Sequence, residues 1–259
     1  IWSGVNPISV SFWRTMLAAL ALTPFMIRDL KKRGLNAPLK LIILGGLALA
    51  IHFMAWITSL YYTTVAMSVT IVSTYSVFTI PITLALGGRV RGLTIIGASI
   101  ALIGVAAMMY SSYGLNIGSL LGDALALIGS ISGAFYFTIG QLARVRESTS
   151  VYSTLVYASA SLFTAPVALV MGVNLTLPNI RSLVMIILIV VGPMLMGHTL
   201  LNYSLKYLPA TVVSTVTLIE PIGSTILAYL LLHQPVGLTE ALPMAITLIG
   251  VYLSIKGGL

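Results

Sequence analysis

HTLLNYSLKYLPATVVSTVTLIEPIGSTILAYLL, residues 198–231, decides the fold class of this chain. Together with the apolar residues before it, this stretch holds two segments that can each cross a hydrocarbon core roughly 30 Å thick. It also contains His198, Asn202, Glu220 and Pro221. A polar group in lipid is costly unless something local satisfies it. We therefore expect the polar side chains to face protein or a water-filled cavity.

The composition indicates an integral membrane protein. Of the 259 residues, 58% are hydrophobic and 7% are charged, whereas roughly a quarter are charged in a typical soluble domain. The formal net charge of +8 comes from basic residues in short gaps between apolar segments, where such residues set membrane orientation. We therefore expect the lipid bilayer as a partner and no nucleic acid. The absence of cysteine excludes disulfides and thiolate chemistry.

Nine apolar segments predict an all-α membrane protein. Small residues recur in the fourth and the last of them, which favours close contact between helices. The nine segments cover residues 7–27, 39–60, 65–86, 92–111, 119–141, 151–171, 181–205, 210–232 and 239–256.

The two halves of the chain repeat each other. Matching residues are separated by 146 positions, or by 145 after a one-residue slip. We therefore predict a first repeat at residues 1–112 and a second at 117–256. The matches are His52 with His198, Trp56 with Asn202, Gly104 with Gly250, and Ser59-Leu60-x-Tyr62 with Ser204-Leu205-x-Tyr207.

The repeat predicts ten helices in all. The segment at 119–141 has no counterpart in the first repeat, because the shift places that counterpart before Ile1. We expect a tenth helix ahead of residue 1, so that nine helices are present here and the first is missing. Each repeat then has five helices, an odd number, so the two repeats should lie in the membrane with opposite orientation.

The basic residues agree with this topology. Eleven of the thirteen fall in gaps on one side of the membrane, while Arg14 and Arg181 lie elsewhere. By the positive-inside rule that side is cytoplasmic. We therefore expect a multi-pass protein of the cell membrane with a cytoplasmic C-terminus. The eleven residues are Arg28, Lys31, Lys32, Arg33, Lys40, Arg89, Arg91, Arg144, Arg146, Lys206 and Lys256.

Two inverted repeats also suggest transport. If the repeats exchange two slightly different conformations, a central site opens alternately to each side of the membrane. The sequence therefore favours a secondary transporter that works by alternating access. We expect the bound solute to lie among the segments at 39–60, 65–86, 181–205 and 210–232.

Several motifs point to a known family. Asn6-Pro7-Ile8-Ser9-Val10-Ser11 leads to Arg14, Ser-Leu-x-Tyr occurs in each repeat, and Glu220-Pro221 lies in the penultimate segment. With the Gly-rich last segment of each repeat, these motifs resemble the EamA-like transporters of the drug/metabolite transporter superfamily. The resemblance covers essentially the whole chain and implies ten helices, a monomer, and export or exchange of small metabolites such as amino acids.

The chain departs from the family pattern at one place in each repeat. Members often have Gly-Glu at the end of the fourth helix of the repeat. Here the matching positions are Gly87-Gly88 and His233-Gln234. Whatever those glutamates do in relatives, no carboxylate does it in this chain.

Two pairs of residues carry the predicted substrate site. His52 and Trp56 are spaced i, i+4, as are His198 and Asn202, so each pair lies on one helix face. Because the pairs are repeat-equivalent, they should face each other near mid-membrane. We interpret them as substrate-binding residues, although each histidine could instead satisfy a helix carbonyl.

Glu220 is the carboxylate that lies deepest in a predicted span. A desolvated glutamate could couple transport to protons, and otherwise it would form a structural ion pair or hydrogen bond. Pro221 frees a carbonyl and lets the helix kink. Tyr75 is the repeat counterpart of Glu220 and is a further candidate for substrate contact, while its neighbouring hydroxyls could instead bond their own helix. Pro81, on the same segment as Tyr75, is expected to be structural.

Arg14 and Tyr136 complete the candidates. Arg14 lies about two turns into the first segment, where it should snorkel to the interface, pair with Glu220, or meet a substrate carboxylate. We expect a structural role for Arg14. Tyr136 should reach the substrate cavity from the segment at 119–141.

The sequence contains no His-Glu-x-x-His motif, phosphate loop or dinucleotide glycine pattern. We therefore expect no cofactor, no metal, no catalytic residue and no enzyme activity, with a small-molecule substrate as the partner. Three histidines and one deep glutamate leave a mononuclear metal site as an alternative, although their spacing does not single one out. One alternative is an intramembrane enzyme that uses His198 and Glu220 as an acid/base pair on a lipid-borne substrate. Another is a passive channel or lipid flippase.

Overall fold

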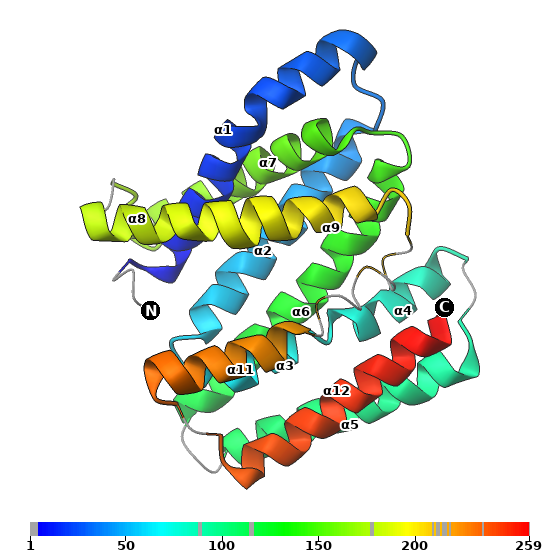
Figure 1. Cartoon of the computed structure of the whole chain (residues 1–259), viewed down its shortest axis with the longest axis vertical. Coiled ribbons are helices and arrows are strands. Elements are labelled where there is room, and N and C mark those ends of the chain that lie inside the picture. The colour runs from blue at the N-terminus through cyan, green and yellow to red at the C-terminus, as the bar shows by residue number, and fades with distance from the viewer. Residues whose placement is uncertain are drawn as a thin grey trace. The chain divides into compact units, whose positions relative to one another are not determined.

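The computed structural model describes residues 5–87, 90–113, 117–176, 179–208, 210, 213, 217, 219–234 and 236–258. Its regular elements are all helical (Figure 1). They are α1 Pro7–Arg33, α2 Leu39–Ser59, α3 Val65–Val72, α4 Tyr75–Ala85, α5 Gly92–Tyr113, α6 Ile117–Arg144, α7 Thr149–Val170, α8 Ile180–Ile189, η1 Val190–His198, α9 Thr199–Ser204, α11 Ile219–Leu232 and α12 Leu238–Gly258.

The predicted all-helical membrane fold is confirmed. Six helical stretches in the described part are long and apolar enough to cross a membrane, and three further apolar helices are shorter. Together they match the nine apolar segments of the sequence. The match is least complete at 210–232, where the described helix α11 begins only at Ile219.

The spans at 65–86 and 181–205 are not continuous α-helices. Between α3 and α4, the hydroxyls of Ser73 and Thr74 donate to the carbonyls of Val69 and Ile71, at 2.8 and 2.7 Å. These hydroxyls therefore bond their own helix, which was the structural alternative for them. Between α8 and α9, the nine residues of η1 form a π-helix that contains Pro193. Proline removes a backbone donor, so it favours such a change of hydrogen-bond register.

The chain forms two compact units, each with residues from both predicted repeats. Unit 1 comprises Ile1–Ile57 and Phe135–Leu208, and unit 2 comprises Thr58–Ala134 and Pro209–Leu259. The units therefore cut across the predicted repeats at 1–112 and 117–256, which remain a prediction about the sequence.

In unit 1, α1 packs against its repeat counterpart α7. The Ser150 hydroxyl donates to Asp29 Oδ2 at 2.6 Å, and Ser161 Oγ lies 3.9 Å from Met16 Sδ. Along these contacts the residue number rises in α1 as it falls in α7, so the two helices are antiparallel. Opposite directions for equivalent helices are what inverted repeats require.

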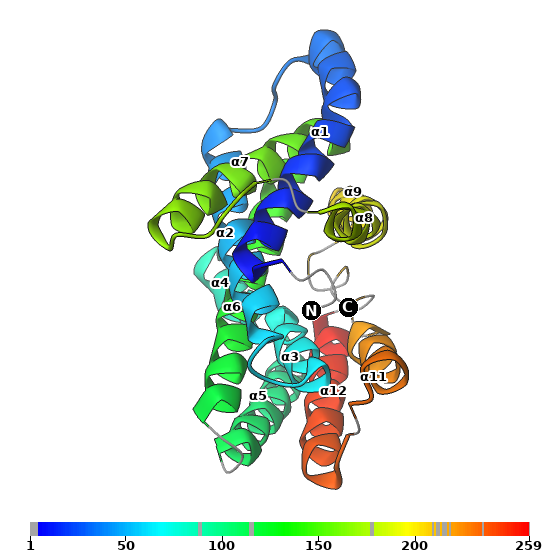
Figure 2. The same ribbon diagram turned by 90° about the vertical axis from the view of Figure 1, so that its left-hand side faces the viewer.

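In unit 2, α5 packs against its counterpart α12, and the two lie side by side in Figures 1 and 2. A Cβ at Gly104 would lie 2.7 Å from Thr247 N, and one at Gly250 would lie 2.7 Å from Ala101 Cα. These two contacts are equivalent under the 146-residue shift, so this helix pair is also antiparallel and symmetric. The glycines allow the backbones to approach closely, as the small-residue pattern predicts.

A third contact between counterparts joins α3 to the segment that contains α11. The Val65 N–H donates to Gln234 Oε1 at 3.2 Å, and the Tyr75 hydroxyl donates to Thr217 Oγ1. Gln234 is one of the positions where the chain departs from the family pattern. Its amide oxygen satisfies a backbone donor in the first turn of α3, a bond that needs an acceptor and no negative charge.

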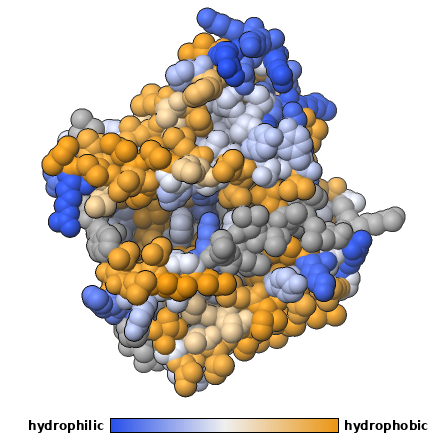
Figure 3. Space-filling model, viewed as in Figure 1, coloured by the Kyte–Doolittle hydropathy of each residue, from blue (hydrophilic) through white to orange (hydrophobic). Residues whose placement is uncertain are grey.

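The outer faces of several helices are apolar. In Figure 3, hydrophobic side chains gather over α8 and α12, and hydrophilic ones gather where α1 ends. Such faces fit contact with hydrocarbon. Exposed members include Ile180, Val184, Leu188, Ile222, Ile226, Leu230, Leu238, Leu242 and Ile249.

Replacing Gly250 with alanine should destabilise the protein, because the new Cβ would overlap the α5 backbone at Ala101. Overpacking of this kind costs about 1–3 kcal/mol in free energy of unfolding. Thermal unfolding of the detergent-solubilised protein measures the effect. Gly223→Ala is the matched control, because its Cβ would meet open space and alanine favours a helix by up to about 1 kcal/mol. Equal melting temperatures for the two variants would contradict this packing.

Candidate functional site

Four predicted site residues meet in unit 1 as part of a ring cluster. We call His52, Phe53, Trp56, Tyr136 and His198 the aromatic cluster. His52 lies with its ring centroid 5.7 Å from that of Trp56, and His198 lies 6.2 Å from Tyr136. The cluster combines apolar ring faces with imidazole, indole and phenol donors, so it can contact an amphipathic solute.

The repeat-equivalent histidines face each other, as their spacing predicts. The ring centroids of His52 and His198 are 6.3 Å apart. Because the two positions are exchanged by the 146-residue shift, this contact lies at the local pseudo-two-fold of unit 1. A symmetric pair at such a point is where inverted-repeat transporters place their substrate sites.

Asn202 is the hydrogen-bonding centre beside the aromatic cluster. Its Oδ1 accepts from the Tyr136 hydroxyl at 2.7 Å, and its Nδ2 donates to Ser153 Oγ at 3.1 Å and Tyr157 Oη at 3.4 Å. The side chain is 0% exposed. Asn202 therefore positions Tyr136 and connects α6, α7 and α9.

The π-helix places His198 and Asn202 on either side of a register change. His198 is the last residue of η1, and Asn202 lies within α9. In the described part of the chain, His198 Nδ1 is buried and has no hydrogen-bond partner. A buried polar atom of this kind calls for an explanation, such as a ligand or a water.

Arg14 lies inside unit 1. The guanidinium carbon is 3.8 Å from the centroid of the Phe53 ring, and the residue is 3% exposed. This burial excludes snorkelling to the surface for Arg14 in this structure. The stacked geometry is a cation–π contact, which is strongest when both partners are desolvated.

Tyr75 and Glu220, the remaining predicted site residues, belong to unit 2. Tyr75 is buried and bonded to Thr217. Thr217 lies in a turn, and its carbonyl accepts from the Glu220 N–H at 2.9 Å. Glu220 is exposed in the first turn of α11, where the helix dipole favours a carboxylate. We expected a desolvated glutamate within a span, so this placement differs from the expectation.

The two prolines singled out in the sequence occupy different helix positions. Pro221 lies in the first turn of α11, where a missing N–H costs little. The carbonyl that the proline leaves without its helix donor, that of Thr217, accepts from the Glu220 N–H instead. Pro81 lies inside α4, where it removes a helix hydrogen bond.

The sequence model of the EamA-like transporter family matches residues 2–110 and again 120–256. The chain belongs to the EamA-like transporter family. The predicted resemblance is thereby confirmed, and this family member is a multi-pass membrane protein with a transporter role.

Curated relatives align with nearly the whole of this chain. An uncharacterized transporter of Archaeoglobus fulgidus is 26% identical over 97% of this chain and 87% of its own length. An uncharacterized transporter of Clostridium kluyveri is 25% identical over 95% of this chain and 82% of its own length. One solved crystal structure, described only as that of a protein, matches with a TM-score of 0.68 over 97% of this chain and 88% of that chain. At 16% identity, this last likeness shows the fold alone.

The structure of this EamA-like protein also shows polar residues that the motifs did not single out. Arg144 is 1% exposed, and its Nε donates to the Asn202 carbonyl at 2.9 Å. The guanidinium also donates to the Glu147 carbonyl and to Thr149 Oγ1. Arg144 thus ties the end of α6 to the residue whose side chain positions Tyr136.

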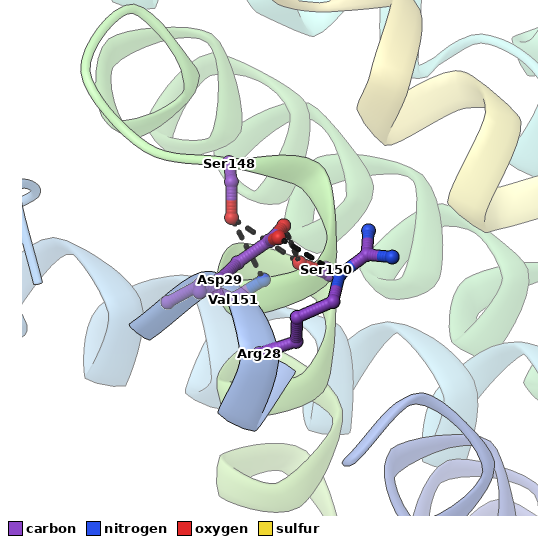
Figure 4. A network of polar contacts seen from close by, with 5 residues as sticks. All are labelled: Arg28, Asp29, Ser148, Ser150 and Val151. Carbon is purple, nitrogen blue, oxygen red and sulfur yellow. Dashed lines mark hydrogen bonds and ion pairs between the residues drawn. The ribbon is translucent and has the colours of Figure 1, made fainter. Parts of the chain in front are cut away.

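Glu147 and Asp29 hold the neighbouring loops. Glu147 Oε2 accepts from the N–H groups of Asn36 and Ala37 at 2.8 and 3.0 Å. Asp29 accepts from Ser150 at the start of α7 and lies 3.7 Å from Arg28 Nε (Figure 4). These carboxylates anchor α1 and the α1–α2 loop to the chain around residue 148.

The donor set does not suggest a metal centre. No group of three or more His, Asp or Glu side chains in the described ranges is placed to hold a metal ion. Metal sites usually need three or four such ligands.

Replacing Arg144 with alanine should lower the free energy of unfolding by about 2–3 kcal/mol, because the hydrogen bonds of a buried charged group are lost. Arg146→Ala is the matched control, because Arg146 is exposed in the same loop. This substitution also removes one positive charge. That control should change stability by less than about 0.5 kcal/mol. Thermal unfolding in detergent distinguishes the two, and equal losses would contradict a structural role for Arg144.

Proposed function

We propose that this protein is a secondary transporter that moves small metabolites, such as amino acids or related amphipathic solutes, by alternating access. The direction we propose is export across the cell membrane, with the basic loops and the C-terminus in the cytoplasm. The observation that carries the proposal is the contact between His52 and His198, whose ring centroids are 6.3 Å apart. A symmetric polar contact inside an apolar fold fits a substrate site.

The antiparallel pairing of counterpart helices supports the mechanism. α1 packs with α7, and α5 packs with α12. Each pair consists of the same helix from two oppositely oriented repeats. Repeats that differ slightly in conformation can exchange those conformations, and the exchange would open the site to the other side. A monomer is sufficient for this mechanism.

The proposal assigns substrate contact to seven residues. The rings and the Asn202 amide supply stacking surfaces and hydrogen bonds for an amphipathic solute. Glu220 would also exchange protons, because it is a carboxylate at the exposed start of α11. The seven residues are His52, Trp56, Tyr75, Tyr136, His198, Asn202 and Glu220.

Counter-flow in proteoliposomes tests transport directly. We expect saturable exchange of a labelled amino acid in the wild-type protein and at least a tenfold loss in His198→Ala, because an imidazole of the symmetric pair is removed. His233→Asn is the matched control: His233 is exposed with φ 53°, a conformation that asparagine tolerates. Absence of counter-flow with every amino acid tested, from folded protein, would contradict the proposal.

The same vesicles test proton coupling. Glu220→Gln should keep counter-flow but lose accumulation driven by a pH gradient, because the amide cannot exchange a proton. Uptake is measured with and without the gradient for both proteins. Gradient-driven accumulation that is unchanged in the variant would exclude Glu220 as the coupling residue. Chemical conversion of an added solute or lipid into a product, with no gradient present, would instead support an intramembrane enzyme.

A further inference from the structure

The strongest feature that the proposed site leaves unexplained is a buried cation beside it. Arg14 stacks on one member of the aromatic cluster, Phe53, at 3.8 Å. The His198 ring lies edge-on to the same Phe53 ring, with centroids 5.1 Å apart. A guanidinium and an imidazole therefore lie around one shared apolar ring in the interior of unit 1.

The guanidinium of Arg14 suits recognition of a carboxylate. A guanidinium carries five N–H donors around the rim of its plane. Five donors can serve several oxygens at once. Arg14 can therefore keep contacts within the protein and still offer a two-pronged bond to a carboxylate.

His198 supplies a second, independent observation. Its Nδ1 is a buried atom with no hydrogen-bond partner among the described residues. Leaving such an atom unsatisfied costs about 1–3 kcal/mol. A neutral imidazole with its proton on Nδ1 can donate to a carboxylate oxygen, so one ligand could satisfy this atom and bind Arg14 as well.

The charge of Arg14 suits an anion. Arg14 is 3% exposed, and electrostatic attraction is strong away from water. The neutral imidazole of His198, beside the same Phe53 ring, adds a hydrogen-bond donor and no competing charge.

We propose that Arg14 and His198 form a carboxylate-binding subsite, in which Arg14 holds the carboxylate and His198 Nδ1 donates to one of its oxygens. This inference rests on the proposed function and narrows the substrate to solutes that carry a carboxylate. The remainder of the solute would lie against the rings of Trp56 and Tyr136. Arg14 then has a binding role, in place of the structural role expected from the sequence.

Matched acid and amide ligands test the subsite without requiring transport. The melting temperature of the purified protein in detergent is measured with benzoate or benzamide and with leucine or leucinamide, at constant ionic strength. We expect saturable stabilisation by each acid, with at least about tenfold weaker binding of the matching amide, because a charge-assisted bidentate contact is lost.

Variants assign the effect to the two residues. Arg14→Gln should remove the preference for the acid. Arg14→Lys keeps the positive charge but loses the two parallel N–H donors of the guanidinium, so it should weaken the preference about tenfold. Arg146→Gln is the control, because Arg146 is exposed outside the aromatic cluster. His198→Phe should also weaken acid binding, whereas His198→Asn should restore much of it, since the asparagine amide places a donor near the position of Nδ1.

The outcomes separate this subsite from transport itself. Equal stabilisation by acid and amide, no stabilisation by either acid, or an unchanged preference in folded Arg14→Gln would each overturn the subsite. If counter-flow is saturable but leucinamide competes as well as leucine, transport stands and the subsite fails. Acid binding that depends on Arg14 in a protein without counter-flow would uphold the subsite and reject transport.

Discussion

The constraint on which the rest of the structure depends is that polar groups in a membrane-spanning fold must find partners inside the protein. Asn202 meets this constraint with both its side chain and its backbone. Its side chain bonds Tyr136, Ser153 and Tyr157, and its carbonyl accepts from Arg144. One residue therefore connects the aromatic cluster with the buried arginine at the end of α6, so the position of Tyr136 depends on contacts that Asn202 makes with both its side chain and its backbone.

Symmetry organises the packing around this centre. Within each unit, helices that correspond between the repeats lie against each other, and close approach at Gly104 and Gly250 repeats the same contact twice. Equivalent contacts thus recur in pairs, and His52 and His198 are equivalent residues that contact each other directly. A fold of this kind brings functional side chains from both repeats to one place, which a single repeat could not do.

Much of the fold could be predicted from the sequence, because span length and the 146-residue separation are strong signals. The separation also predicted that His52 and His198 would meet. Phe53 carried no such signal, since a phenylalanine in an apolar span is unremarkable until a guanidinium is found on its ring. The buried Arg144 could not be distinguished from the exposed Arg146, because both lie in one basic gap. The π-helix that ends at His198 was also missed, since a hydrogen-bond register leaves little trace in an apolar pattern.

The measurement that tests the central claim most directly is the reactivity of a single cysteine at Trp56, which is half-buried in the aromatic cluster. The chain has no native cysteine, so Trp56→Cys can be labelled with a membrane-impermeant thiol reagent from either side of the membrane in oriented vesicles. Alternating access predicts labelling from both sides, with a transported solute protecting the thiol and shifting the balance between them. Labelling from one side alone, whatever the solute or gradient, would contradict the account.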